Sequence, residues 1–467
     1  MTDAVLHLVR RATWGPTPGL LEEVAQKGAG RWLEEQLAPA TIPDADCDAF
    51  VRRFPKIRRS TAEVRAQDSH GSYGTMQQLS YATMGRYCWS RRQLFEVMCD
   101  FWSNHLNVPC NITPVWADRH DYDTTVVRRH ALGRFSDMLL ASSRHPAMLR
   151  YLDGALSTRT APNQNYGREL LELHTLGVFG GYGEADVQEA ARLMTGWRFS
   201  GDGSAVFTPK EHDAGAVRVV NWSAPAHDPA SGAQVQASLL AHLARHPSTA
   251  RHLATKLGQR FVSDTPPASL VDHLAKVYLD NDTQIVPVLR ALFASKEFAA
   301  SAGAKTRRPL EGLVAAVRAL GAGPATSGYG GADVLLFMVR NMGHEPLAWP
   351  APNGYADVAS AWVSAGSTMR RWNHTWELAT RRRPENLAWR ASEPLFAAPP
   401  PTWGEFVARL VQRLLFRPAT ARETAALLRL CDKQPTAPVV PGDPSLAPTR
   451  LADLSAMVLN SPGHMER

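Results

Sequence analysis

Apolar residues recur at intervals of three, four and seven positions along most of this chain, the spacing that places them on one face of an α-helix. The stretches that follow this pattern most closely are 19–37, 91–106, 133–143, 185–197, 238–246, 249–262, 268–279, 284–295, 309–320, 331–342 and 403–416. The pattern therefore predicts a mostly α, multi-helix globular fold.

One stretch, 204–222, alternates apolar and polar residues as strands do, with turn-forming residues at 212–215 between its halves. It predicts one small β-hairpin inserted in the helical body. Proline-rich stretches at 393–404 and 433–449 interrupt the helical pattern and predict exposed connectors. We therefore expect a main helical body over residues 1–395 and a C-terminal helical segment over 396–467 that packs on it.

Composition narrows the class of protein. A chain of 467 residues, 44% hydrophobic and 20% charged, is typical of a folded globular protein. Its net charge of +7 comes from scattered arginines without a nucleic-acid-binding motif, so we expect no nucleic-acid partner. Five cysteines without a Cys-x-x-Cys pair indicate reduced thiols. No signal peptide and no run of about 18 apolar residues is seen, which predicts a cytoplasmic protein without a membrane span.

The stretch densest in polar chemistry is NQNYGRELLELHTLGV, residues 163–178. As a helix it would take Asn163 or Asn165 as N-cap and end in the glycine-rich loop that follows. A period of 3.6 residues places Asn165, Glu169 and Glu172 on one face, with the two carboxylates one turn apart. Such carboxylates repel unless they are solvated, bridged by an arginine such as Arg168, or bound to a cation. The pattern leaves open an exposed polar stripe and a functional site.

Histidines could add to this face. His105 follows the apolar side of 91–106 and should point inward, as a hydrogen-bonded core residue or as a ligand. His174 stands two residues after Glu172, so the two cannot chelate one ion from a regular helix, and the Glu-x-x-His spacing of dimetal helices is absent. A divalent metal of unknown identity would need ligands from several elements. The candidate ligands are Glu169, Glu172, His105 and His174.

Three further groups are ambiguous. His120 and Asp121 could add ligands or start a solvated helix, whereas His212 and Asp213 favour a turn. The loop WPAPNGYADVASAWVS, residues 349–364, is rigid and aromatic. It could stack on a sugar or attach the loop to the core.

Taken in order, HLVRRATWGPTP, FWSNHLNV, RRHALGRFSDML, NQNYGRELLELHTLGV and WPAPNGYADVASAWVS span nearly the whole chain. Together they resemble the bacterial family called domain of unknown function 1800. The resemblance carries no established catalytic residues; it implies frequent export and a sulfatase-like protein partner. This chain departs from the family pattern in two places, with Gln164 in place of a glutamate and Val217 in place of a lysine.

No nucleophile elbow, P-loop, HExxH or dinucleotide fingerprint occurs. We therefore predict an enzyme with a carboxylate-rich pocket, hydrolase-like or metal-dependent, acting on a small polar, carbohydrate-like substrate. Its expected groups are Glu169 and Glu172 as acid and base or as ligands, oriented by Arg168 and Asn165, with His105 and His174 completing the wall. Two alternatives stay open: a noncatalytic scaffold or partner-binding protein with a buried polar network, and a non-haem metal oxidoreductase.

Overall fold

Helices make up 61% of the fold, which confirms the mostly α prediction. The computed structural model describes residues 3–67, 72–389 and 399–467. The α-helices up to the first strands are α1 (Asp3–Ala12), α2 (Leu20–Lys27), α3 (Ala29–Leu37), α4 (Ala45–Val51), α5 (Thr61–Gln67), α6 (Tyr73–Trp89), α7 (Gln93–His105), α8 (Arg119–Tyr122), α9 (Phe135–Arg144), α10 (Pro146–Tyr151), α11 (Gln164–Glu169) and α12 (Glu184–Leu193). The later ones are α13 (Gly232–Ala244), α14 (Pro247–Phe261), α15 (Ala268–Asp280), α16 (Ile285–Ala294), α17 (Lys296–Ala299), α18 (Pro309–Leu320), α19 (Ala332–Asn341), α20 (Ala365–Ala379), α22 (Trp403–Leu415), α23 (Ala421–Cys431), α24 (Pro448–Leu459) and α25 (Pro462–Met465).

Short helical turns join these elements. The 3₁₀ turns are η1 (Pro39–Thr41), η2 (Pro55–Arg58), η3 (Thr113–Val115), η5 (Gly154–Leu156), η7 (Pro209–Glu211), η8 (Pro229–Ser231), η9 (Ala359–Ala361) and η10 (Pro444–Leu446). Two turns are π-helical, η4 (Asp123–Arg128) and η6 (Leu170–His174). Because π turns are rare and often border functional sites, these two segments indicate where a functional site is expected.

Helix α18 lies at the centre of the fold. Residues Pro309 to Ala319 are buried on every side of it, as expected for a helix that is apolar nearly all round. The stretch 19–37, by contrast, forms two helices rather than one. Gly28 has a φ of 84° between α2 and α3, a conformation that interrupts a helix and that glycine adopts without strain.

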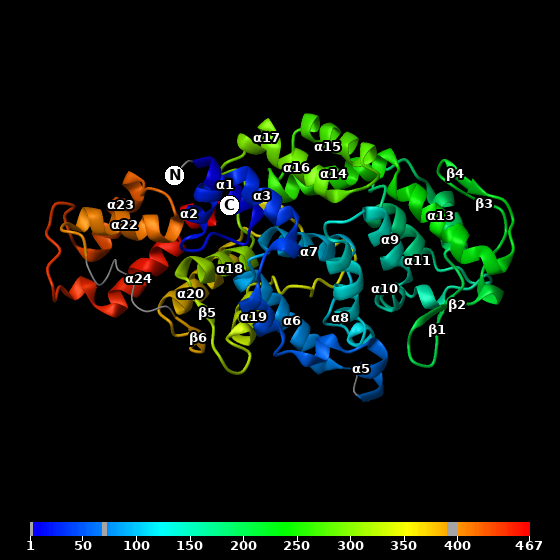
Figure 1. Ribbon diagram of the computed structural model, residues 1–467, viewed down its shortest axis with the longest axis horizontal. Coiled ribbons are helices and arrows are strands. Elements are labelled where there is room, and N and C mark those ends of the chain that lie inside the picture. Colours follow the sequence, from blue (N-terminus) through cyan, green and yellow to red (C-terminus); the bar gives the residue numbers. More distant parts are fainter. Residues whose placement is uncertain (1–2, 68–71, 390–398) are drawn as a thin grey trace.

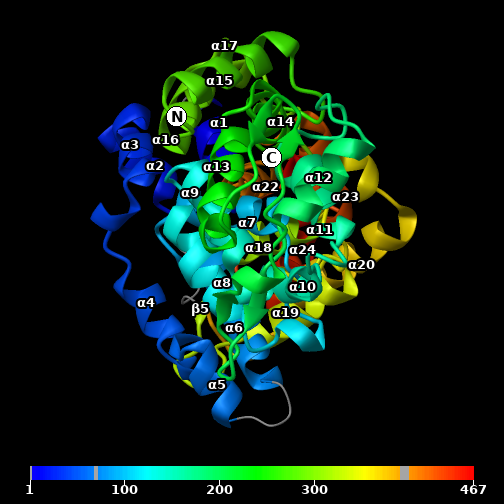
Figure 2. The ribbon, with the colours of Figure 1, turned by 90° about the vertical axis from the view of Figure 1, so that its right-hand side faces the viewer.

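The molecule is elongated, with the C-terminal helices α22, α23 and α24 at one end of the long axis and the strands β1 to β4 at the other (Figure 1). Figure 2 looks along this axis from the strand end, where α10, α11, α12 and α13 face the viewer. Buried side chains of the C-terminal helices, including Trp403, Phe406 and Leu454, belong to the same hydrophobic core as Val9 of α1 and Leu313 of α18.

The region of the predicted hairpin carries strands, arranged as two short antiparallel hairpins. They pair β1 (Trp197–Phe199) with β2 (Ala205–Phe207), and β3 (Val217–Val219) with β4 (Trp222–Ala224). A further short pair joins β5 (Gly323–Pro324) to β6 (Leu387–Ala388). The turn before β2 explains the difference, because the Asp202 carboxylate accepts hydrogen bonds from the Ser200 hydroxyl and the Ser204 backbone N–H and closes β1 onto β2.

Over residues 3–67, 72–389 and 399–467, no helix combines the length and hydrophobicity that crossing a lipid bilayer requires.

Candidate functional site

The polar stretch 163–178 is helical, but it is not one regular helix. Asn163 caps α11: its side-chain oxygen accepts a hydrogen bond from the Asn165 backbone N–H at 2.9 Å. After Glu169 the helix widens into the π turn η6, and the Thr175 hydroxyl donates to the Leu170 carbonyl at 2.6 Å. The π turn changes the angular position of every later side chain, so the 3.6-residue period fails at His174.

Glu169 and Glu172 are both half-buried on this segment, whereas Asn165 is exposed. Burial, and then the neighbouring Glu172, raise the pKa of Glu169, and Arg168 opposes that rise. The Arg168 guanidinium itself donates to both carboxylate oxygens of Glu184, at 2.8 and 2.9 Å. The fold therefore favours the protonated form of Glu169 more than water does. Arg168, beside it, forms its hydrogen bonds with Glu184.

His174 faces the interior. It is 1% exposed, and burial, Lys256 and His252 lower its pKa to about 3. Its Nε2 is buried with no hydrogen-bond partner in the described part of the chain. Its backbone carbonyl accepts a hydrogen bond from Nε2 of His105, at 3.1 Å. His105 is buried, which confirms the prediction that it points inward.

A polar seam forms where α7, η6 and α14 meet; we use this name for His105, His174, His252, Lys256, Arg260 and Asp357. The α14 members are spaced four residues apart, so they form one stripe along that helix. His252 Nε2 contacts the Leu173 carbonyl at 3.3 Å. Lys256 Nζ lies 3.1 Å from His105 Nδ1. Lys256 and His252 are half-buried, so the seam reaches the surface on this side of α14.

These contacts fix the proton positions on His105. A carbonyl only accepts, so Nε2 carries the proton that is donated to His174, and Nδ1 is the acceptor for the Lys256 amine. Burial, then Lys256, His252 and His174, hold the pKa of His105 well below its usual value. The imidazole beside Lys256 is thus neutral at physiological pH.

Lys256 is the least compensated charge of the seam. Burial lowers its pKa from 10.5 to about 8, opposed by the more distant Asp357. Among the ion pairs of the described residues none includes Lys256, whereas Asp357 pairs with Lys305 at 3.1 Å and Arg260 at 3.4 Å. An amine with a pKa near neutrality and a neutral acceptor beside it is the arrangement expected of an acid–base group.

Behind the seam lies a network of buried ion pairs. Glu311 accepts hydrogen bonds from Arg260, Arg308 and Arg467. Although burial raises the pKa of Glu311, these three guanidinium groups hold it well below its usual value. Arg308 also pairs with Asp100 of α7 at 3.1 Å. The network joins α7, α14 and α18 and keeps the polar stripe of α14 in position.

The aromatic loop 349–364 is attached to the C-terminal end of α7 and to the segment that follows it. The Asn107 side chain donates to the carbonyls of Trp349 and Ala351, at 2.9 and 2.7 Å, and Asn104 accepts from the Tyr355 backbone N–H at 3.0 Å. The Trp362 indole stacks on His344 with ring centroids 4.3 Å apart. Through Asp357, this loop forms one border of the seam.

The same loop also reaches the Glu169 side of α11. The Tyr151 hydroxyl donates to the Pro350 carbonyl at 2.7 Å. Burial, and then Glu169, raise the pKa of Tyr151 to about 12. Glu169 and the seam therefore border one loop.

The predicted metal ligands are divided between these places: His105 and His174 lie in the seam, and Glu169 and Glu172 lie on the half-buried face of α11 and η6. In the described ranges, no three histidine, cysteine, aspartate or glutamate side chains are grouped to hold a metal ion. His212 is buried, with its Nε2 2.9 Å from His227, and Asp213 binds Arg192 at 3.0 Å, so both support the hairpin region.

The model of one protein family matches residues 7–465, with the description "Protein of unknown function (DUF1800)". The chain belongs to this family. No curated protein and no solved structure matched the chain. Within this DUF1800 chain, Gln164 is exposed at the start of α11, and Val217 is buried in β3 at 5% exposure. Position 217 is therefore part of the core here and cannot contact an anion.

Sequence reasoning missed Lys256, His252, Arg260 and Asp357. The spacing of the three α14 residues was a usable signal, since residues at i, i+4 and i+8 of a helix share one face. Asp357 gave no such signal, because only the folded loop brings it to α14.

Proposed function

We propose that this DUF1800 protein is an enzyme with hydrolase-like acid–base chemistry, acting on a small polar substrate at the solvent side of the polar seam. The observation that carries the proposal is the Lys256 amine, which contacts a neutral imidazole and forms no ion pair with a carboxylate of the described ranges. At its pKa of about 8 this amine takes up and returns a proton near physiological pH, as a general acid–base group must. His105 is its positioning residue.

Glu169 is the second acid–base group of the proposal. Its raised pKa favours the protonated carboxyl that protonates a leaving group, and Glu172, one turn on, is the second carboxyl group of the pair. The carbohydrate-like substrate belongs to this part of the proposal, because paired carboxyl groups are the usual means of cleaving glycosides.

The test is turnover of chromogenic substrates, 4-nitrophenyl esters and 4-nitrophenyl glycosides, between pH 6 and 10. We expect activity to rise through pH about 8. We expect Lys256→Met to lower kcat by roughly 10²-fold or more. Lys276→Met is the matched control, because Lys276 lies on the exposed face of the neighbouring helix α15. Activity that is equal in both variants, or pH-independent, would overturn the proposal.

A noncatalytic scaffold is the second candidate, and the observation in its favour is the buried network around Glu311. The Glu169→Gln and Glu172→Gln variants separate the two. A melting temperature lowered by many degrees in each, with no loss of ligand binding or turnover, would favour the scaffold. Variants that fold normally and lose turnover would favour the enzyme.

Metal-dependent chemistry, hydrolytic or redox, stays a separate proposal. Neutral imidazoles such as those of the seam are the protonation state that metal ligation requires. Elemental analysis of the purified chain tests it: a stoichiometric metal that is lost in His105→Gln or Glu169→Gln supports the proposal, and a metal-free chain with full turnover opposes it.

The sulfatase-like partner is a proposal that rests on the family, and the cytoplasmic location is a proposal that rests on the five cysteines, which form no disulfide. Co-purification of the tagged full-length chain from its own cells, followed by mass spectrometry of each cell fraction, tests both. Recovery from the cell exterior would contradict the cytoplasmic location, and absence of any sulfatase-like protein would contradict the partner.

A further inference from the structure

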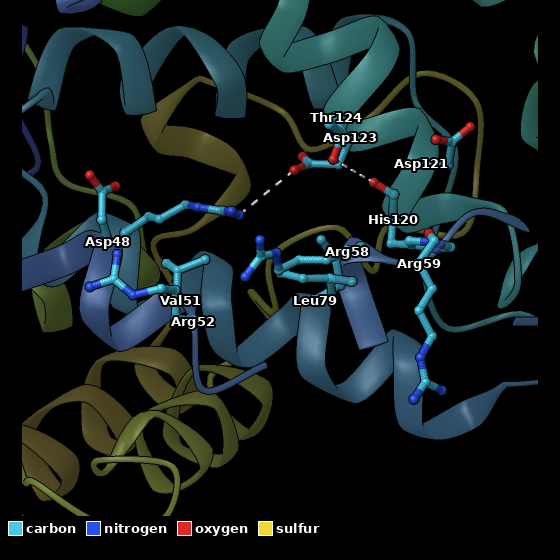
Figure 3. A pocket seen from close by; sticks show the side chains of 12 residues that line it. Asp48, Val51, Arg52, Arg58, Arg59, Leu79, His120, Asp121, Asp123 and Thr124 are labelled. Carbon is cyan, nitrogen blue, oxygen red and sulfur yellow. Dashed lines mark hydrogen bonds and ion pairs between the residues drawn. The ribbon is translucent and has the colours of Figure 1, made fainter. Parts of the chain in front are cut away.

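A second polar site, separate from the seam, lies where the arginine-rich segment 52–59 meets α8 and η4. It is a cavity of about 450 Å³, within the range of small-molecule pockets, and we call it the arginine cavity. Its polar lining includes Arg52, Arg58, Arg86, His120, Asp123 and Thr124. Figure 3 shows Arg52 and Arg58 toward the lower side of the view and Asp123 and Thr124 toward the upper side.

The positive charges of this cavity exceed what its carboxylates neutralise. Asp48 pairs with Arg92 at 3.6 Å and Asp121 pairs with His145 at 3.0 Å, so both are engaged by groups outside the cavity. Asp123 is 3.8 Å from Arg86, too far for a hydrogen bond. Arg52 and Arg58 are exposed at the rim.

Two buried nitrogen atoms of the lining lack hydrogen-bond partners in the described part of the chain. One is Nη1 of Arg86, whose side chain is 14% exposed. The other is Nδ1 of His120, a residue that is 2% exposed. Unpaired buried polar atoms are costly, and a bound ligand that forms hydrogen bonds with them removes that cost.

The two atoms call for different chemistry. Arg86 Nη1 is a donor and requires an anionic or carbonyl oxygen. His120 donates from Nε2 to the Arg59 carbonyl at 2.8 Å, so its Nδ1 is the acceptor and requires a hydroxyl or N–H group. Burial lowers the pKa of His120, which keeps this imidazole neutral and preserves the acceptor. Asp123 and Thr124 add further acceptors beside it.

We infer that the arginine cavity binds a small ligand that carries both an oxyanion group and hydroxyl groups, such as a phosphorylated polyol or sugar. The oxyanion binds Arg86 at the floor and Arg58 and Arg52 at the rim through charge-assisted hydrogen bonds, which are stronger than neutral ones. The hydroxyl groups donate to His120 Nδ1 and Asp123. The π turn η4 begins at Asp123, which places this backbone irregularity at the wall of the cavity.

The experiment is isothermal titration calorimetry of the full chain at constant ionic strength with three probes: inorganic phosphate, glucose 6-phosphate and glucose. We expect glucose 6-phosphate to bind more tightly than phosphate, and glucose not to bind. Arg58→Gln should weaken both phosphate probes roughly tenfold, as loss of one charge-assisted contact does. Arg218→Gln, at an exposed position of β3, is the matched control and should change neither.

His120→Ala tests the hydroxyl contact, and should remove the preference for glucose 6-phosphate while leaving phosphate binding in place. Where that variant does not fold, the wild-type preference between the two probes decides the same point. Failure of both phosphate probes to bind would overturn the inference, as would equal losses in Arg58→Gln and Arg218→Gln. Displacement of both probes by heparin at equal ionic strength would instead indicate a diffuse polyanion surface. The seam residues take no part in these measurements, so their outcome is independent of the proposed enzyme activity.

Discussion

Replacing Lys256 by methionine should stabilise the folded chain at neutral pH, although it removes a polar contact. The fall in the pKa of Lys256 from 10.5 to about 8 corresponds to about 3 kcal/mol of free energy opposing the charged amine. The variant also loses the hydrogen bond to His105, which lowers this stabilisation by about 1 kcal/mol. Because Lys256 is only half-buried, the stabilisation that is left is smaller still. We expect a net gain of about 1 kcal/mol in unfolding free energy at pH 7.

The pH dependence of this gain is the specific signature. Below pH 8 the amine is protonated in the folded and the unfolded chain, so its cost is fully present. Between pH 8 and 10.5 only the unfolded chain keeps the proton, so the stability of the wild type rises with pH and the cost is lost. The advantage of Lys256→Met should therefore be largest near neutrality and vanish by about pH 10.5.

Thermal unfolding of both chains in parallel, from pH 6.5 to 10.5, measures this difference. Lys276→Met is the control, because Lys276 is 73% exposed and pairs with Asp280 at the surface. Its effect should stay small and vary little below pH 10. A Lys256→Met chain that melts below the wild type at pH 7, by an amount independent of pH, would show that Lys256 acts as part of the ion-pair network, and the reasoning would be refuted.

Four further perturbations test other parts of the account. Glu311→Gln should lower the free energy of unfolding in denaturant by about 3–5 kcal/mol, because three buried guanidinium groups lose the carboxylate that they share; a change below about 1 kcal/mol would contradict this. Asn163→Ala should cost about 1 kcal/mol through the lost N-cap of α11, and Asn163→Asp should restore it. Gly177→Ala should lower the melting temperature and speed amide hydrogen exchange over 173–183, because φ is 82° at Gly177 and a Cβ would lie 2.8 Å from His252 Nδ1. An unchanged melting temperature would argue against this contact. Acid should destabilise the chain as pH falls from 6.5 toward 4, because His252 stays neutral until a pKa of about 4; His252→Gln should flatten that slope.

Periodicity predicted the helices well where one face is apolar and a cap residue marks the end. The stretch 309–320 coincides with α18, and 91–106 with α7, within three residues. It failed at Gly28, where one predicted helix is two, because a single glycine with positive φ interrupts a pattern that continues across it. The region of the strands was predicted correctly, but their pairing was not. The chain turns at Asp202 and pairs β1 with β2, whereas the prediction placed the turn at 212–215.

The candidate site was predictable only in part, for two physical reasons. The helix becomes a π turn at Leu170–His174, and no pattern in the sequence predicts this change. The direction of the His174 side chain therefore could not be predicted from its spacing. The histidines, Lys256 and Asp357 come from α7, η6, α14 and the loop 349–364, with 69 residues between His105 and His174 and 151 between His105 and Lys256, and only packing brings them together. The arginine segment 52–59 and His120 likewise meet through the fold, which is why charge patterns along the chain suggested dispersed positive charge.

The ionisation of Lys256 is the point on which the proposed chemistry depends. Competitive acylation of the intact chain between pH 6 and 11, with mass spectrometry of each lysine peptide, measures the pKa of every reactive amine in one experiment. Labelling of Lys256 should reach half its maximum near pH 8. Half-maximal labelling of Lys256 close to pH 10.5, the ordinary value of a lysine amine, would contradict the account.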